Sequence, residues 1–516
     1  MDQARWQQAR LIPTTGISGQ DEQEMRATSA LLAVLGSVRE FGTAILRPLG
    51  GPAGVISTFS EVQFESSDGR KVRPDGVIRV SRGTKSWTAL VEVKTGSSNL
   101  GKEQVESYLD VARDNGFDAV LTISNQLASA ENVHPVEVDK RKVKKVALYH
   151  LSWTEVLSIA VAQRVHRGVS DPDQAWILAE LIRYLEHPRS GALDFADMGA
   201  SWVAVREALS AGTLRTTDKG LAEVVSSWEQ LLRFAALRLE RELGTGVQVV
   251  ISRKEQADLA LRKARLTEEL VNNHVLSGTL RVPNTVGDIE VVADLRGNRC
   301  QVCVDVAAPL EGRPQTRVNW LTRQLHDAPD QLRIDAFALN ARTSSSELLK
   351  VVKANPTVLL LDPNGELRRF RVAATSTLGS KRGTGKGSFI DSVLGSVDGF
   401  YELVLQRLRP WQARAPQLPK EGTAVEAAGI DVSVLPGEGG IAIEPSEELN
   451  LEKRSNTSEA FEATSEGETE ALLVTWDQQM EDLAHERSRI GLPQATVAEN
   501  ASDLRDAPDV QFVVPP

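Results

Sequence analysis

Two apolar runs followed by a segment with helical spacing constrain the fold more than any other part of the chain. They lie in residues 72–108, which read VRPDGVIRVSRGTKSWTALVEVKTGSSNLGKEQVESY. The run Trp87–Lys94 alternates with period two, which predicts a strand with Glu92 and Lys94 on one face and valines on the other. The run before it, Val72–Val80, predicts a neighbouring strand. Strands followed by a helix predict an α/β fold.

Polar side chains are expected to gather at one edge of this sheet. Asp75 enters its strand through a Pro-Asp-Gly turn, which brings the carboxylate beside the neighbouring strand. After Gly101 the apolar spacing becomes helical, and Gln104 and Tyr108 lie one turn apart on that helix. The helix is therefore expected to lean this polar pair over the site at that edge.

The residue types in this set suit a magnesium site. Mg²⁺ takes one or two carboxylates and keeps room for phosphate oxygens and water, so Asp75 and Glu92 are the candidate ligands. Lys94 is placed to orient or deprotonate an attacking water and to offset charge on a phosphate. A Glu-Lys pair on a strand is also common as a solvated surface pair, so the pair alone predicts little.

The combined pattern resembles the PD-(D/E)xK, or restriction-endonuclease-like, nuclease superfamily. Pro74-Asp75 is followed by sixteen residues and then by Glu92-Val93-Lys94. Gln104-x-x-x-Tyr108 is similar to an additional motif of the RecB-like branch. The order helix, three strands, helix, two strands, helix over residues 20–168 agrees with that family, which implies a three-layer α/β/α core.

The resemblance also implies roles for individual residues. Asp75, Glu92 and the backbone carbonyl of Val93 are expected to bind Mg²⁺, for which Mn²⁺ is a substitute. An acidic residue on the first helix often completes such sites, and both Glu24 and Glu22 are candidates. The implied activity is hydrolysis of phosphodiester bonds in DNA.

The remaining chain divides into three parts by pattern. Residues 169–244 predict a helical connector, and residues 245–410 predict a second α+β domain that resembles no family. The acidic tail, 411–516, is predicted to be disordered, apart from a short amphipathic helix at 468–490. In the second domain we expect strands at 247–251, 332–339 and 357–361, three strands within 276–307, and helices at 257–272, 317–325 and 389–408.

Two short motifs in the second domain are not expected to carry chemistry. Cys300 and Cys303 lie on a predicted strand without a second cysteine pair or a nearby histidine, so they are interpreted as buried small hydrophobic residues. The segment Gly379–Lys386 departs from the phosphate-loop pattern at two positions and is interpreted as a flexible basic loop.

The net charge of -11 is concentrated in the tail. Residues 411–516 contain 7 basic and 21 acidic side chains, which leaves 52 basic and 49 acidic side chains in residues 1–410. The densest basic run, 140–145, predicts either a phosphate-contacting loop or the solvated arm of a hairpin. The sequence begins without an apolar signal segment and has no run long enough to span a membrane, so we expect a cytoplasmic protein with no membrane partner.

These features predict a Mg²⁺-dependent DNA endonuclease that acts in restriction, defence or DNA repair. The alternative is a nuclease-fold protein that cuts little or nothing and serves as a DNA-binding, interaction or stress-response protein. Besides DNA, the partners to consider are a second copy of the chain and a protein bound through the second domain or the tail.

Overall fold

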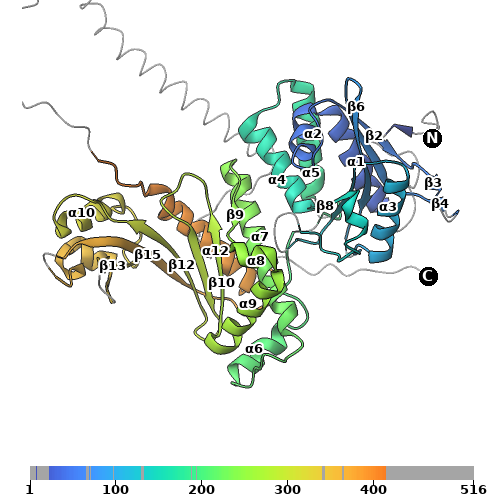
Figure 1. Cartoon of the computed structure of the whole chain (residues 1–516). Helices are drawn as coiled ribbons and strands as arrows, with labels where there is room; N and C mark the ends of the chain where they lie inside the picture. Colours follow the sequence, from blue (N-terminus) through green and yellow to red (C-terminus); the bar gives the residue numbers. More distant parts are fainter. Residues whose placement is uncertain are drawn as a thin grey trace, which may run out of the picture. The chain divides into compact units, whose positions relative to one another are not determined.

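Two β-sheets with helices packed on them give the chain a mixed α/β fold (Figure 1). The computed structural model describes residues 7–8 and 22–413, apart from 66–68, 70, 97, 129–132, 188, 193, 340–342 and 363–364. The predicted disorder of the tail and its helix at 468–490 lie outside the described residues.

The first sheet has six strands in the order β1-β2-β5-β6-β7-β8. Strands β2, β5 and β6 pair antiparallel, whereas β7 and β8 are added in parallel. A parallel neighbour requires a crossover, and helix α3 (Lys102–Asp114) provides it between β6 and β7. The strands are β1 (Gln7–Gln8), β2 (Val55–Ser60), β5 (Gly76–Arg82), β6 (Lys85–Val93), β7 (Ala119–Ser124) and β8 (Ala147–Ser152), and a separate pair is formed by β3 (Phe64–Glu65) and β4 (Lys71–Val72).

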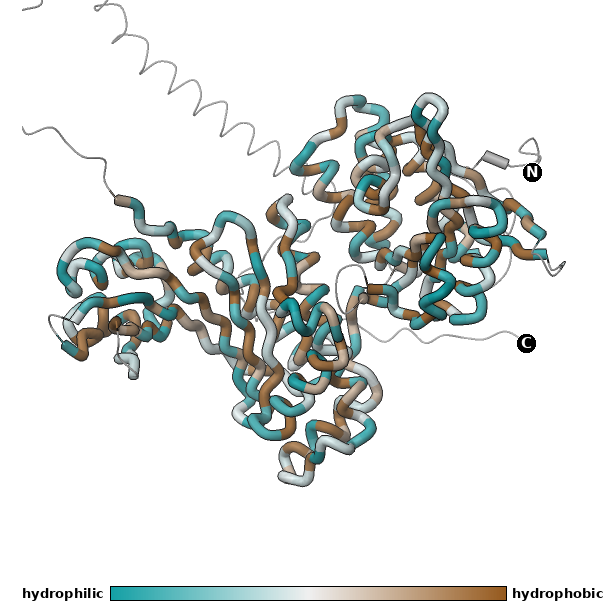
Figure 2. The backbone as a smooth tube through the Cα atoms, viewed as in Figure 1, coloured by the Kyte–Doolittle hydropathy of each residue, from teal (hydrophilic) through white to brown (hydrophobic). Residues whose placement is uncertain are grey.

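Helices cover both faces of this sheet because its central strands are apolar on both sides. Val91 and Val93 of β6 share one core cluster with four helices, and Leu90 shares another with α3. Figure 2 shows apolar residues along the strands and hydrophilic residues in the connecting loops. The four helices are α1 (Glu22–Ser37), α2 (Arg39–Leu46), α4 (Trp153–Val161) and α5 (Pro172–Glu186).

The strand predicted over Val72–Val80 is divided in the structure. Residues 71–72 belong to β4, and β5 begins only at Gly76. Pro74 has no N–H to donate, and the Asp75 carboxylate bonds to the backbone of β6. The interruption leaves the Asp75 side chain at the end of the hairpin, where the candidate site lies.

The second sheet has seven strands in the order β14-β13-β15-β12-β11-β10-β9, and all of its pairs are antiparallel. Its strands are β9 (Gln248–Val249), β10 (Val275–Arg281), β11 (Ile289–Asp294), β12 (Arg299–Ala307), β13 (Arg333–Ala338), β14 (Ser344–Leu348) and β15 (Leu367–Thr377). The helices in this part of the chain are α6 (Trp202–Ser210), α7 (Leu221–Leu243), α8 (Arg253–Ala257), α9 (Leu259–Asn273), α10 (Pro314–Gln324), α11 (Leu349–Ala354) and α12 (Phe389–Leu403).

The helices between the two sheets are divided between two hydrophobic cores. Leu178, Leu181 and Ile182 of α5 belong to the core of the first sheet. The buried faces of α6 and α7, by contrast, belong to the core of the second sheet. The segment interpreted as one connector thus contributes to both cores.

Two predictions for the second domain are wrong, and two of its strands were not predicted. The segment expected as a strand at 357–361 is the 3-10 helix η4 (Pro356–Leu359), whose first residues are capped by the Asn355 side chain. The helix expected at 257–272 is broken at Asp258, which ends α8 and caps α9. Strands β14 and β15 were not expected. Cys300 and Cys303 are free and buried, which agrees with their interpretation as hydrophobic residues.

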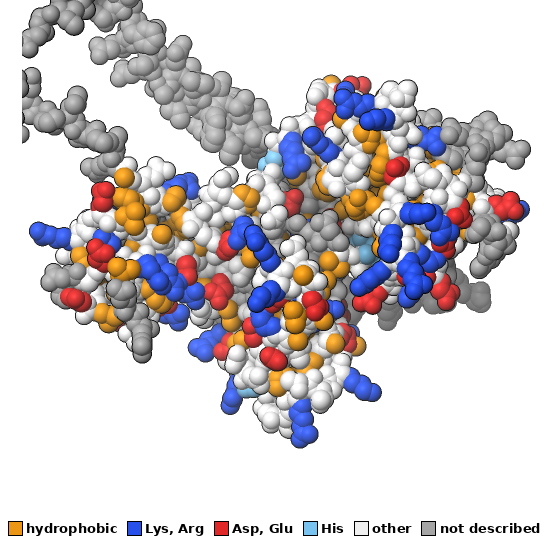
Figure 3. All heavy atoms as spheres, viewed as in Figure 1, with side chains coloured by type: hydrophobic (Ala, Val, Ile, Leu, Met, Phe, Trp, Pro, Cys, Tyr) orange, Lys and Arg blue, Asp and Glu red, His pale blue; other side chains and the backbone are white. Residues whose placement is uncertain are grey.

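The basic run 140–145 lies between β7 and β8 around the 3-10 helix η2 (Lys142–Lys144). It is not the arm of a hairpin, because β7 and β8 run parallel. Lys142 forms an ion pair with Asp110 on α3. The side chains of the other four basic residues in the run are exposed. Figure 3 shows Lys and Arg side chains gathered over this side of the first sheet.

Within the described residues, no single helix is long and apolar enough to cross a membrane. The adjoining helices α1 and α2 pass the same length and composition test only as a pair, with a bend of 107° between them.

Candidate active site

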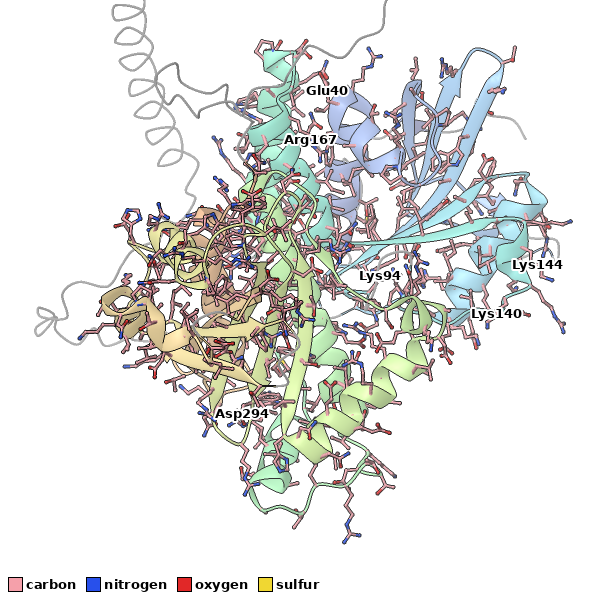
Figure 4. All side chains as sticks on the ribbon, turned by 60° about the vertical axis from the view of Figure 1, so that its left-hand side comes forward. Glu40, Lys94, Lys140, Lys144, Arg167 and Asp294 are labelled. Atoms are coloured by element: carbon pink, nitrogen blue, oxygen red, sulfur yellow. The ribbon has the colours of Figure 1, made fainter. Side chains whose placement is uncertain are left out.

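Six side chains predicted from the sequence gather at the end of β6. They are Glu24, Asp75, Glu92, Lys94, Gln104 and Tyr108. Five of these side chains form one network of hydrogen bonds and ion pairs, and the sixth, Asp75, bonds to the backbone next to that network. Figure 4 shows Lys94 at the end of the sheet. Three segments far apart in the sequence, α1, the β5–β6 hairpin and α3, therefore supply one site.

Asp75 is held against β6 by a backbone hydrogen bond. Its Oδ2 accepts from the N–H of Val93 at 2.8 Å, beyond the last β5–β6 pair at Gly76 and Val91. Gly76 makes the close packing of α1 on this strand possible, since a Cβ at that position would lie 2.4 Å from Cδ1 of Leu32. The Asp-Gly sequence thus determines the position of the Asp75 carboxylate and allows the close packing of α1, the helix that carries Glu24.

Lys94 lies between two carboxylates. Its Nζ is 2.6 Å from Oε1 of Glu92 and 2.9 Å from Oε1 of Glu24. Glu22, the other acidic candidate on α1, instead pairs with Arg26. Of the two candidates, Glu24 is the one that contacts the site.

The polar pair on α3 orients Glu92. Gln104 donates from Nε2 to Oε1 of Glu92 at 2.6 Å and lies 3.1 Å from the hydroxyl of Tyr108. Spacing of four residues on a helix makes Gln104 and Tyr108 neighbours, as expected. Oε1 of Glu92 therefore accepts from both Lys94 and Gln104, which fixes its carboxylate group.

The second oxygen of Glu92 has no such partner. Glu92 is 1% exposed, and its Oε2 is fully buried without a hydrogen bond. Leaving a buried charged oxygen without a hydrogen bond is costly, and a bound cation is one way to satisfy such an atom. The charge of Glu92 acts in turn on Asp75, whose pKa it helps to raise.

The pKa values at the site reflect three carboxyl groups around one ammonium. Burial, together with the neighbouring charge of Glu92, raises the pKa of Asp75 to about 8. Burial alone would lower the pKa of Lys94, but Glu92, Glu24 and Asp75 outweigh it and raise that pKa above its usual range. Burial and Glu92 raise the pKa of Tyr108. At neutral pH Lys94 is therefore charged and Tyr108 is a neutral phenol.

The donor set fits a small, hard divalent cation. A cation near Oε2 of Glu92 would satisfy that oxygen and relieve the repulsion that raises the pKa of Asp75. Val93, whose N–H donates to Asp75, also carries the carbonyl group expected to bind the metal. Among the described residues, no group of three or more His, Cys, Asp or Glu side chains is already arranged around one metal position.

A row of polar side chains that crosses three strands from Glu92 was not predicted from the sequence. Thr122 of β7 is the register partner of Glu92, and His150 of β8 is the partner of Thr122. Oγ1 of Thr122 lies 2.9 Å from Nδ1 of His150 and 2.8 Å from Nε2 of His134. Burial lowers the pKa of both histidines, that of His134 to about 4. The alternation of side chains along β7 was the one sequence signal that could have placed Thr122 on the same face as Glu92.

The end of β6 is also anchored from α4. Nε1 of Trp153 donates to the carbonyl of Lys94 at 2.9 Å, and the N–H of Lys94 donates to Ile123 at 2.7 Å. The backbone that carries Lys94 is thereby fixed from two sides.

No family model, curated protein or solved structure matches the chain. Its function therefore has to be inferred from its own residues, chiefly from the side chains around Glu92.

Proposed function

We propose that the chain is a Mg²⁺-dependent DNA endonuclease with a PD-(D/E)xK layout in residues 20–168. The observation that carries the proposal is the network around Glu92, in which a buried, unpartnered carboxylate oxygen lies beside Asp75 and the charged Lys94. Helices on both faces of a sheet with parallel β6, β7 and β8 support that layout. The settings we expect are restriction, defence or DNA repair.

In this proposal, Asp75, Glu92 and the carbonyl of Val93 hold the metal. Bound there, Mg²⁺ supplies Lewis-acid stabilisation of charge on the phosphate oxygens. Two carboxylates, of Glu92 and Glu24, face the single ammonium of Lys94, and a bound cation would also favour the ionised form of Asp75.

Lys94 acts as a hydrogen-bond donor in the proposed reaction. Its raised pKa keeps the ammonium protonated, so it orients the attacking water and offsets phosphate charge instead of removing a proton. Glu24 positions the ammonium from α1, and Gln104 positions Glu92 from α3. Tyr108 in turn supports Gln104.

The exposed cations of residues 140–145 are the proposed contact for the DNA backbone. Lys140 and Lys144 lie on the same side of the first sheet as α3, which forms part of the site (Figure 4). Exposed lysines bind phosphates without reading sequence, so they would contribute affinity that falls with salt.

One observation favours a second candidate function. The Lys94 ammonium already pairs with Glu92 and Glu24 within the protein, as in a structural ion pair. A protein of this fold that binds DNA or a protein partner but cuts little or nothing would keep such a network intact.

Cleavage of supercoiled plasmid in Mg²⁺ tests the proposal. The full chain should nick the plasmid, whereas Asp75→Ala and Lys94→Ala should each lower the rate at least about a hundredfold. Lys85→Ala is the matched control, because this exposed lysine lies at the other end of the same strand.

The outcomes distinguish the two candidates. Equal nicking by the unaltered chain and both site variants would identify a contaminant and reject the endonuclease. Binding of DNA by the unaltered chain without any cleavage would favour the second candidate.

A further inference from the structure

A cavity of about 700 Å³ lies against α2, away from the candidate active site. Its wall includes Arg39 and Arg47, at the two ends of α2, and Arg167, at the end of the π-helix η3 (Ala162–Arg167). Figure 4 shows Glu40 and Arg167 together and apart from Lys94. Three guanidinium groups from two segments of the chain therefore line the same cavity.

Arginines outnumber acidic residues three to one in the described wall of this cavity. None of the three guanidinium groups forms a hydrogen bond or ion pair with a residue in the described part of the chain. The single acidic residue of the wall, Glu40, accepts from the N–H and Oγ of Ser170 at 3.1 and 2.8 Å. Its carboxylate is thus already bound by a neutral residue.

A hydrogen-bond acceptor is fixed in the same wall. Gln163 is 7% exposed and donates from Nε2 to the carbonyl of Gly168 at 2.6 Å. Because a carbonyl only accepts, this bond sets the orientation of the amide. Oε1 of Gln163 is left without a partner among the described residues, ready to accept from a ligand. The π-helix that carries Gln163 is a rare conformation that is frequently found at functional sites.

The chemistry of the wall defines the class of ligand. Guanidinium groups match phosphate oxygens in geometry and charge, and Gln163 adds an acceptor for an amino or hydroxyl group. A volume of this size suits a small molecule, since ligand cavities commonly measure about 300–1,000 Å³. We propose that this cavity binds a phosphorylated small molecule of nucleotide size, at a site separate from that of the proposed nuclease activity.

Calorimetric titration of the full chain with ATP in EDTA tests the proposal without cleavage or metal binding. ATP should bind saturably, and Arg47→Ala or Arg167→Ala should weaken it at least about tenfold, the loss of one charge-assisted hydrogen bond. Arg296→Ala is the matched control, because this arginine is exposed in the turn between β11 and β12. All three side chains are exposed, so the variants should keep the unfolding midpoint of the unaltered chain.

Three outcomes would overturn the proposal. The first is no saturable binding of ATP or pyrophosphate up to concentrations on the order of millimolar. The second is binding of adenosine as tight as that of ATP, or a loss of ATP affinity in Arg296→Ala equal to that in the cavity variants. Either result would mean that Arg47 and Arg167 do not bind the phosphate groups. The third is dependence on Arg47 and Arg167 for a single-stranded oligonucleotide but not for ATP, which would make the wall a nucleic-acid surface.

Discussion

Two buried glutamates, one beside each sheet, begin from the same local arrangement. Glu92 of β6 and Glu229 of α7 are 1% and 2% exposed. Each binds a cation through Oε1, Lys94 at 2.6 Å and Arg262 at 2.7 Å, and each leaves Oε2 buried without a partner. Burial and an ion pair are therefore common to both and do not by themselves mark a functional site.

The surroundings of the two glutamates differ. Glu229 and Arg262 form a balanced pair, in which Arg262 of α9 is 2% exposed. Around Glu92, the carboxylate of Glu24 pairs with the same ammonium of Lys94, which is 15% exposed, and the carboxyl group of Asp75 accepts from the neighbouring N–H of Val93. The first arrangement suits a structural pair between helices, and the second suits a site that attracts an additional cation.

The largest effect expected from this contrast is on stability. Glu229→Ala leaves the Arg262 guanidinium buried and unpaired, so the free energy of unfolding should fall by about 3–5 kcal/mol. Urea denaturation of the unaltered chain and the variant measures it. Glu92→Ala should cost less, because it also relieves the repulsion with Asp75. An equal loss in both variants would remove the distinction between the two glutamates.

The next effect concerns Gln104, which donates to Glu92, whereas no amide side chain among the described residues donates to Glu229. Gln104→Ala frees one bond to Oε1 of Glu92 and should lower the affinity for Mn²⁺ or the cleavage rate about 10–100-fold, as loss of residues that support metal ligands commonly does. Glu103→Ala, an exposed neighbour on α3, is the control. Equal effects of the two substitutions would argue against a positioning role.

The sequence predicted the site better where the information was local. Alternation in Trp87–Lys94 and the four-residue spacing on α3 were enough to bring Glu92, Lys94 and Gln104 together. The choice of Glu24 over Glu22 depended on the packing of α1 against β5, which no local pattern contains.

The fold shows the same limit. Strand β15 was missed because Arg369 and Arg371 interrupt its apolar pattern, and both pair with Asp305 on the neighbouring strand β12. Cross-strand pairs of this kind join residues that are distant in sequence. The charged residues in β15 are therefore explained only once the register between β12 and β15 is known. The row from Glu92 to Thr122 and His150 was missed for the same reason.

A further effect concerns the pH dependence of stability. Because the folded pKa of Asp75 is raised to about 8, its protonated form favours folding below the unfolded pKa, and that contribution is lost as pH rises through about 8. Asp75→Asn, which stays neutral, should therefore be more stable than the unaltered chain at pH 9. The difference should shrink toward pH 5. Urea denaturation in EDTA at both pH values measures it, and a difference independent of pH would contradict the assigned cause.

Binding of Mn²⁺ tests the central claim, that the carboxyl groups around Glu92 form a metal site and the pair at Glu229 does not. Calorimetric titration should show saturable binding to the unaltered chain and to Glu229→Gln. The affinity of Glu92→Gln should be at least about tenfold weaker. Absence of binding to the unaltered chain, or an equal loss in both variants, would contradict the account.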